Sequence, residues 1–127
     1  MSQWTHVNGI IRIDAIRMLR PKKPNIGIPS FWQDEHQAKD IPCGSEGSLN
    51  AELWTNPSES ALSAYTVSIF GDLRDYDDAE AIVSYLNQIT DGCMVRSGIC
   101  EIDVEYKFIY LYHYINDIWT EISRTEK

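Results

Sequence analysis

Residues 64–86 constrain the fold more than any other part of the chain. Their sequence, AYTVSIFGDLRDYDDAEAIVSYL, alternates as a strand up to Phe70 and then changes to helical spacing after a glycine turn. Asp77 followed by Glu80 matches a capping box, which places the start of a helix there. The strand, the tight turn and the capped helix follow one another with no spare residues between them. This junction brings backbone N–H groups, an aromatic ring and charged side chains close together. The segment therefore predicts a place to hold a small polar ligand.

The rest of the chain supplies further elements. Apolar residues on one face continue the helix, and Gly92 is placed to end it in the left-handed conformation. Strand patterns cover residues 7–19, 48–54, 64–70 and 99–106. In the first of these, residues 15–19 could equally form a helical turn. In the last, Cys100 falls on the apolar side and is interpreted as a small core residue.

These elements predict an α+β fold, with an antiparallel sheet of four to five strands and one main helix in the order β-loop-β-β-α-β-β. Residues 107–114 either extend the preceding strand or form another after a turn near Tyr106 and Lys107. Residues 116–127 are expected to form a short C-terminal helix or a frayed tail. The length fits a single domain, 1–127, in which residues 20–47 form a long loop rich in Pro and Gly. Residues 30–39 could form a short helix within that loop.

Charge and cysteine content limit the classes of partner and the cellular compartment that we expect. Eleven basic and nineteen acidic residues give a formal charge of −8, which disfavours DNA and anionic membrane surfaces. The sequence has no apolar run long enough to span a membrane and no secretory signal at its start. Three cysteines without a CxxC spacing favour a reducing compartment. We therefore expect a cytoplasmic protein.

No catalytic residue, metal site or cofactor is predicted. The stretch GSEGS at 44–48 lacks the lysine of a phosphate-binding P-loop and precedes a strand. It is interpreted as a loop that needs positive φ, with ligand contact through Ser45 or the backbone N–H groups as the alternative. The histidines show no metal-binding spacing. The carboxylate row of Glu101, Asp103 and Glu105 is interpreted as a solvated strand face, with a basic partner protein as the alternative.

Phe70 and Arg96 are the main ligand-binding candidates. Phe70 ends a strand on the side opposite its apolar residues, and Arg96 begins the strand after the helix. If that strand returned beside the Phe70 strand, the ring could stack on a base and the guanidinium could bind a phosphate in one crevice. An edge aromatic and an ion-paired arginine are the plainer interpretation. Arg74 is the rival cation, with Asp72 and Asp75 beside it to neutralise it.

Three motifs, WTHVNGIIRID, GSEGSL and AYTVSIFGDLRDYDD, resemble a family of small phage-encoded Thoeris anti-defence proteins of the first type. The resemblance implies a non-catalytic homo-oligomer in the host cytoplasm that sequesters a cyclic ADP-ribose isomer, with cyclic oligonucleotides as a further ligand at a separate site. It also implies that an aromatic and an arginine surround the ADP-ribose. By motif position these are Phe70 and Arg96, with Asp78 or Glu80 at the helix start.

Function is therefore expected to be capture of a cyclic nucleotide signal without cleavage. The alternative from another class is an acidic inhibitor or immunity-type protein that blocks a basic surface of a partner. An enzyme that cleaves the nucleotide would need a base and a metal set that the sequence does not display.

Overall fold

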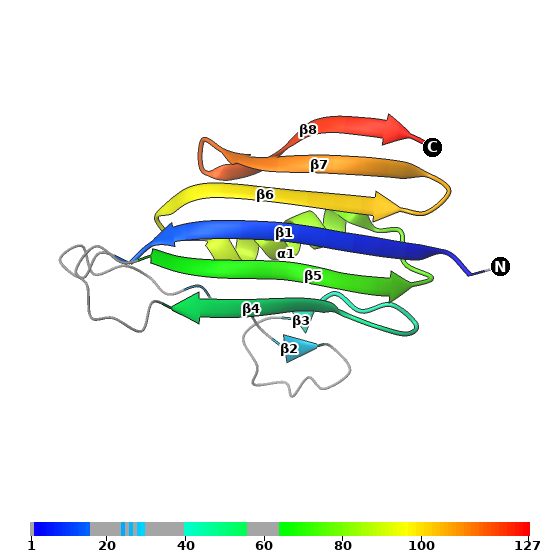
Figure 1. Cartoon of the computed structure of the whole chain (residues 1–127), viewed down its shortest axis with the longest axis horizontal. Helices are drawn as coiled ribbons and strands as arrows, with labels where there is room; N and C mark the ends of the chain where they lie inside the picture. Colours follow the sequence, from blue (N-terminus) through cyan, green and yellow to red (C-terminus); the bar gives the residue numbers. More distant parts are fainter. Residues whose placement is uncertain (1, 16–23, 25, 27, 30–39, 56–63) are drawn as a thin grey trace.

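The computed structural model describes residues 2–15, 24, 26, 28–29, 40–55 and 64–127. These residues form a six-stranded antiparallel sheet with one helix packed against one face (Figure 1). Across the sheet the order is β4-β5-β1-β6-β7-β8. The strands are β1 (Trp4–Asp14), β4 (Leu49–Thr55), β5 (Ala64–Arg74), β6 (Val95–Val104), β7 (Phe108–Ile115) and β8 (Ile118–Glu126), and the helix is α1 (Ala79–Thr90). A separate short parallel pair joins β2 (Ile28–Pro29) and β3 (Asp40–Ile41).

The predicted sheet of four to five strands is wrong, because the C-terminal residues expected to be helical or frayed form the sixth strand, β8. The order β-loop-β-β-α-β-β therefore lacks this strand. Asn116 and Asp117, with φ of 51° and 67°, make the tight turn that folds β8 back onto β7. A register shift opposite Leu111 and Tyr112 breaks the alternation of β8, which hides the strand from a period-2 reading.

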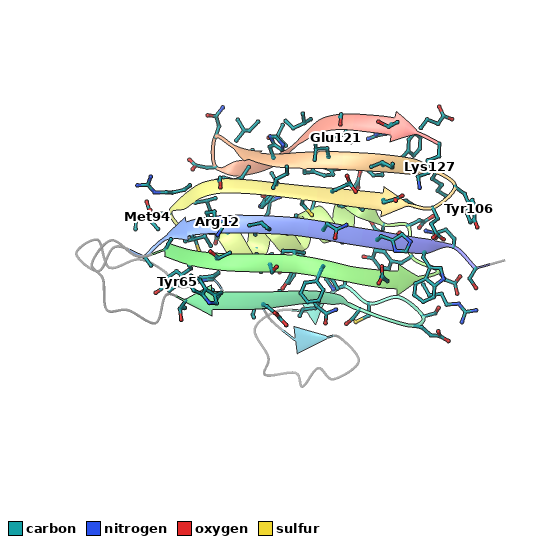
Figure 2. The ribbon with its side chains drawn as sticks, viewed as in Figure 1. Arg12, Tyr65, Met94, Tyr106, Glu121 and Lys127 are labelled. Atoms are coloured by element: carbon teal, nitrogen blue, oxygen red, sulfur yellow. The ribbon has the colours of Figure 1, made fainter. Side chains whose placement is uncertain are left out.

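The long run 99–114 is two strands rather than one. Tyr106, labelled in Figure 2, has a φ of 68° and lies in the turn that separates β6 from β7. The turn is closed by Lys107 N, which donates to Val104 O at 3.1 Å. The helical turn considered at 15–19 and the short helix considered at 30–39 lie outside the described residues, apart from Ala15.

The helix starts one residue later than the capping box predicts. Asp78, not Asp77, is the N-cap, and its Oδ1 accepts from Ala81 N at 3.0 Å. Gly92 follows the helix with a φ of 74°, so its predicted left-handed conformation is confirmed. The glycine turn expected after Phe70 is wrong, because β5 continues through Gly71 to Arg74.

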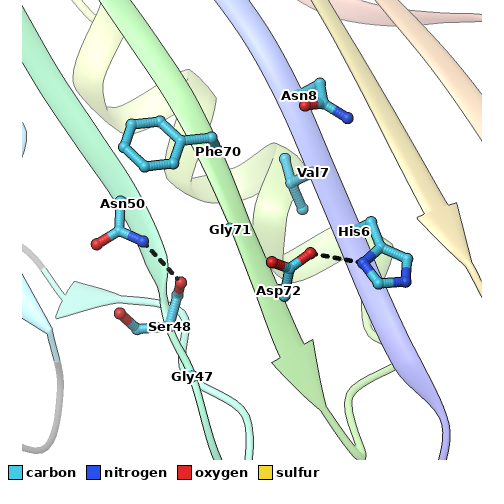
Figure 3. A pocket seen from close by; sticks show the side chains of 9 residues that line it. All are labelled: His6, Val7, Asn8, Gly47, Ser48, Asn50, Phe70, Gly71 and Asp72. Carbon is cyan, nitrogen blue, oxygen red and sulfur yellow. Dashed lines mark hydrogen bonds and ion pairs between the residues drawn. The ribbon is translucent and has the colours of Figure 1, made fainter.

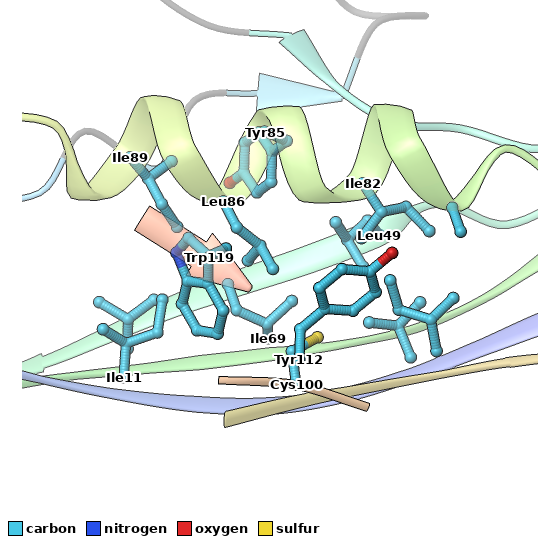
Figure 4. Close-up of a cluster of buried hydrophobic side chains, with 14 of the residues drawn as sticks. Ile11, Leu49, Ile69, Ile82, Tyr85, Leu86, Ile89, Cys100, Tyr112 and Trp119 are labelled. Atoms are coloured by element: carbon cyan, nitrogen blue, oxygen red, sulfur yellow. The ribbon is translucent and has the colours of Figure 1, made fainter. Parts of the chain in front are cut away.

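The core lies between α1 and the sheet (Figure 4). Leu86 and Ile89 from the helix pack towards Ile11, Ile69 and other buried strand residues. Cys100 is fully buried in this layer, and burial raises the pKa of its thiol to about 12, which confirms the core interpretation. The helical pattern missed one core member, since Tyr85 is 2% exposed and its hydroxyl donates to Ile26 O.

The opposite face of the sheet, which we call the open face, has no described element packed on it and faces the viewer in Figure 1. Large apolar side chains exposed on it include Ile10, Trp54, Phe70 and Ile99, by 42%, 57%, 39% and 47%. Because no described element covers these side chains, the open face can offer them to a ligand or a partner.

In the described part of the chain, no helix combines the length and apolar character that a bilayer span requires.

Candidate functional site

A hollow of about 510 Å³ lies on the open face, over the ends of β1, β4 and β5 (Figure 3). Its side chains come from three neighbouring strands and from the loop before β4. The lining residues are His6, Val7, Asn8, Gly47, Ser48, Asn50, Phe70, Gly71 and Asp72. An aromatic ring, two carboxamides, an imidazole and a carboxylate therefore surround one concavity.

The first half of the hollow is a cross-strand row of Asn50, Phe70 and Asn8. Phe70 on β5 is directly opposite Asn50 on β4 and Asn8 on β1. Residues directly opposite in antiparallel strands point to the same face, so the ring lies between two carboxamides. Figure 3 shows the ring leaning towards Asn50, whose Nδ2 donates to Ser48 O at 3.2 Å. A flat heterocycle on this ring would find donors and acceptors at two of its edges.

The second half of the hollow is a histidine held between two carboxylates. His6 Nδ1 lies 2.5 Å from Asp72 Oδ1, and His6 Nε2 lies 2.8 Å from Glu105 Oε2. Glu105 Oε1 also accepts from Trp4 N at 3.0 Å. We call Asp72, His6 and Glu105 the carboxylate–histidine clamp. It joins β5, β1 and the turn after β6 across the open face.

The clamp favours the charged forms of His6 and Glu105. The hydrogen bond to Asp72, followed by that to Glu105, raises the pKa of His6 above its ordinary value of 6.5. The hydrogen bond from His6 lowers the pKa of Glu105. Because both ring nitrogens of His6 are engaged, the imidazole has no free nitrogen with which to take a proton from a bound substrate.

This geometry predicts a pH-dependent contribution of His6 to stability. A raised pKa in the folded state stabilises fully below pH 6.5, and this stabilisation is lost as the pH rises through the folded-state pKa. The Glu105 contribution is present above pH 4.5 and is lost as the pH falls through its lowered pKa. Thermal melts of wild type and His6→Gln should therefore differ most between about pH 4.5 and 6.5 and converge at alkaline pH.

An NMR titration of the His6 ring checks whether a raised pKa of His6 causes this pH dependence. The wild-type pKa should lie above 6.5 and should fall in Asp72→Asn. A stability difference that persists unchanged to pH 9, or a His6 pKa that Asp72→Asn leaves in place, would show that the clamp does not operate.

Phe70 and Arg96 do not share a crevice within one chain, so that expectation is wrong. It required β6 to pair with β5, but β1 lies between them. Arg96 lies at the register shift opposite Arg12 and Ile13, roughly 15 Å along β1 from the Phe70 row at about 3.4 Å per residue. Its Nε donates to the Asp14 carboxylate. The separate roles of Phe70 and Arg96 in binding stay predictions.

Ser45 and Arg74 hold the GSEGS loop against the end of β5. Ser45 N donates to Arg74 O at 2.9 Å, and Ser45 Oγ donates to Asp75 Oδ2 at 2.9 Å. Arg74 Nη1 donates to Glu46 Oε1 at 2.9 Å, so the guanidinium is ion-paired. Gly44 N donates to Gly47 O at 3.0 Å. Two of the backbone N–H groups that could contact a ligand are thus already used, one within the loop and one by β5.

Asp78 and Glu80 line a different, smaller hollow of about 260 Å³ on the helix face. There Arg124 lies over the Tyr110 ring, 4.9 Å from its centroid, and is held by Glu121 Oε1. A ring and a guanidinium therefore do meet in this protein, but the arginine already covers the ring. Asp77 also lines this hollow, so three of its seven lining residues are acidic.

A hollow of about 600 Å³ lies at the C-terminal end of α1. Its ring, Tyr114, packs edge-on against Trp119 with centroids 5.8 Å apart, which leaves less of its surface for stacking. Among residues 2–15, 40–55, 64–127 and the few described between them, no His, Cys, Asp and Glu side chains gather as a metal site. We therefore take the open-face hollow as the candidate site.

Sequence reasoning missed Asn8, Asn50 and His6 as neighbours of Phe70, although it placed Asp72 close to the ring. Each stands at a polar position of its strand, so a signal was present in the alternation. What brings them together is the register between paired residues 20 to 66 positions apart in the chain, and one sequence does not reveal that register.

The comparisons with family models, curated proteins and solved structures gave no match to this chain.

Proposed function

We propose that this protein binds and sequesters a small nucleotide signal of the cyclic ADP-ribose type without cleaving it. The observation that carries the proposal is the Asn50–Phe70–Asn8 row, in which an exposed ring lies between two carboxamides in a hollow large enough for a nucleoside. Base stacking on an aromatic side chain contributes about 1–3 kcal/mol. The resemblance of the sequence to anti-defence proteins supports the same ligand class and a phage origin.

The charges of the hollow favour the nucleoside part of such a ligand over its phosphates. His6 is the only basic residue among the described lining, and two carboxylates already neutralise it. Phosphate groups would therefore project into solvent from a base seated on Phe70. The absence of a free nitrogen on His6 supports retention of the ligand rather than turnover.

A single open hollow is too shallow for strong capture. Nanomolar affinity corresponds to about −12 kcal/mol, well beyond what one stack supplies. A second copy of the chain seated over the open face would enclose the ligand, and the exposed Ile10 and Ile99 beside the hollow would be buried by it. We therefore expect a homo-oligomer, as the sequence resemblance also implies.

The experiment is recovery of the ligand after capture. Purified protein is incubated with cyclic ADP-ribose, separated from free ligand, denatured by heat and analysed by mass spectrometry of the released small molecules. Intact ligand is expected in proportion to the protein. Linear ADP-ribose among the products would show an enzyme, and no ligand at all would remove the proposal for this compound.

Phe70→Ala is expected to weaken binding by roughly 5- to 150-fold, because it removes the stacking surface. Trp54→Ala is the matched control, since Trp54 is 57% exposed on β4 and does not line the hollow. Arg96→Ala should bind like wild type if the hollow of one chain is the whole site, whereas a loss of binding would support the separate role predicted for Arg96. Calorimetry on the three variants makes the comparison, and equal losses in Phe70→Ala and Trp54→Ala would exclude this hollow as the site.

The alternative function, an acidic protein that blocks a basic partner, has one feature in its favour. Ile10 and Ile99 lie directly opposite each other on the open face, with Glu101 two residues from Ile99. The carboxylate row is weaker than it looks in the sequence, because Asp103 pairs with Lys127 and Glu105 with His6. A stoichiometric protein complex that dissociates with salt would favour this function over capture of a nucleotide.

A further inference from the structure

Asp72 stands next to Phe70 on the open face at a spacing that suits a nucleoside. The two residues are two positions apart on β5, so their side chains share a face about 6–7 Å apart. Both line the same hollow. A base centred on the ring would thus place its attached sugar beside the Asp72 carboxylate.

The clamp prepares this carboxylate for a ligand. His6 holds Asp72 Oδ1, while Oδ2 has no hydrogen-bond partner among the described residues and the side chain is 68% exposed. Glu105 fixes the imidazole from its other side. One oxygen is therefore anchored and the other faces the hollow.

The surrounding charges fit a neutral donor better than an anion. On β6, Asp103 lies opposite His6 and pairs with Lys127 at 2.5 Å. On β5, Arg74 beyond the clamp pairs with Glu46. An ionised carboxylate only accepts hydrogen bonds, so it selects hydroxyl groups and repels phosphate.

We propose that Asp72 is the specificity-determining residue of the hollow, binding the ribose hydroxyls of the nucleoside that stacks on Phe70, with His6 and Glu105 as positioning residues. The inference rests on the proposed function, and it names the ligand class as ribonucleosides, or nucleotides built from them, that keep a free sugar hydroxyl next to the base. A deoxy sugar leaves Oδ2 without its donor.

NMR titration at millimolar ligand compares adenosine with 2′,3′-dideoxyadenosine. Wild type is expected to prefer adenosine by roughly 10- to 100-fold, which is the effect of a hydrogen bond to a charged group. Asp72→Asn should lose most of this preference while binding the dideoxy compound as before. Glu101→Gln is the matched control, because it removes one open-face carboxylate that does not line the hollow.

His6→Gln tests whether His6 positions the Asp72 carboxylate for the ligand or only stabilises the fold. In wild type the preference for adenosine should decline as the pH rises past the point at which the imidazole loses its charge, because a neutral ring can donate to only one carboxylate. In His6→Gln the preference should be smaller and independent of pH. Circular dichroism of each variant confirms that it is folded.

The outcomes distinguish the two proposals. If neither nucleoside binds wild type, the hollow is not a nucleoside site and both proposals fail. If both bind equally, the proposed function survives and the role of Asp72 is overturned. The role is overturned as well if Asp72→Asn keeps the preference or if Glu101→Gln loses it equally.

Discussion

Trp119→Ala is expected to lower the free energy of unfolding by about 3–5 kcal/mol. Trp119 is 4% exposed on β8, where its Nε1 donates to Thr90 Oγ1 at 3.3 Å and its ring meets Tyr114. Its backbone N also donates to Asn87 Oδ1 at 3.2 Å, so this one residue attaches the last strand to α1. Urea denaturation followed by circular dichroism measures the loss.

Trp54→Ala provides the matched control, because the same side chain is deleted from an exposed position on the opposite edge strand. A surface substitution of this kind should cost no more than about 0.5 kcal/mol. Equal destabilisation by the two changes would contradict the placement of β8, and would reopen the short C-terminal helix expected from the sequence.

Gly47→Ala should destabilise by roughly 2–5 kcal/mol, which combines the cost of a left-handed alanine with that of a steric overlap. Gly47 has a φ of 72°, and a Cβ there would lie 2.1 Å from Asp72 O. The overlap is with backbone, so the loop before β4 must move away from β5. Since Gly47 lines the hollow, nucleoside binding should weaken in the same variant.

Gly92→Ala separates the two costs of the Gly47 change. Gly92 has a similar φ of 74° but lies after α1, away from the hollow. It should show the conformational cost of about 1–2 kcal/mol and leave binding unchanged. A Gly47→Ala protein that is no less stable than Gly92→Ala would show that the loop does not press on β5 as described.

The parts of the fold that depend on local signals could be predicted. The strand before the helix, the left-handed Gly92 and the buried Cys100 follow from alternation, helical spacing and glycine chemistry within short windows. The glycine turn expected after Phe70 does not form, because Gly71 pairs with both neighbouring strands and β5 continues to Arg74. The β7–β8 hairpin was missed because its turn, Asn116 and Asp117, lacks glycine and because β8 exposes nearly every side chain. Polar edge strands carry little hydrophobic pattern.

The residues that meet at the site depend on the order and register of the strands, which a short sequence window does not show. The alternation of the strand indicated that Phe70 lies on the other face from Ile69. Which residues lie beside Phe70 depended on the position of β1 between β5 and β6. The same insertion moves Arg96 away from the ring. The polar groups beside Phe70 are therefore His6 and two asparagines rather than the guanidinium that the sequence suggested.

The most direct test of the central claim is an NMR map of adenosine binding on the labelled protein, read at the backbone and at the side-chain amides of Asn8 and Asn50. The largest shifts should fall on these two amides and on the backbone of Phe70 and Asp72, with little change at Tyr110 or Arg124. Shifts concentrated on the helix face, or none at millimolar adenosine, would contradict a nucleoside site on the open face.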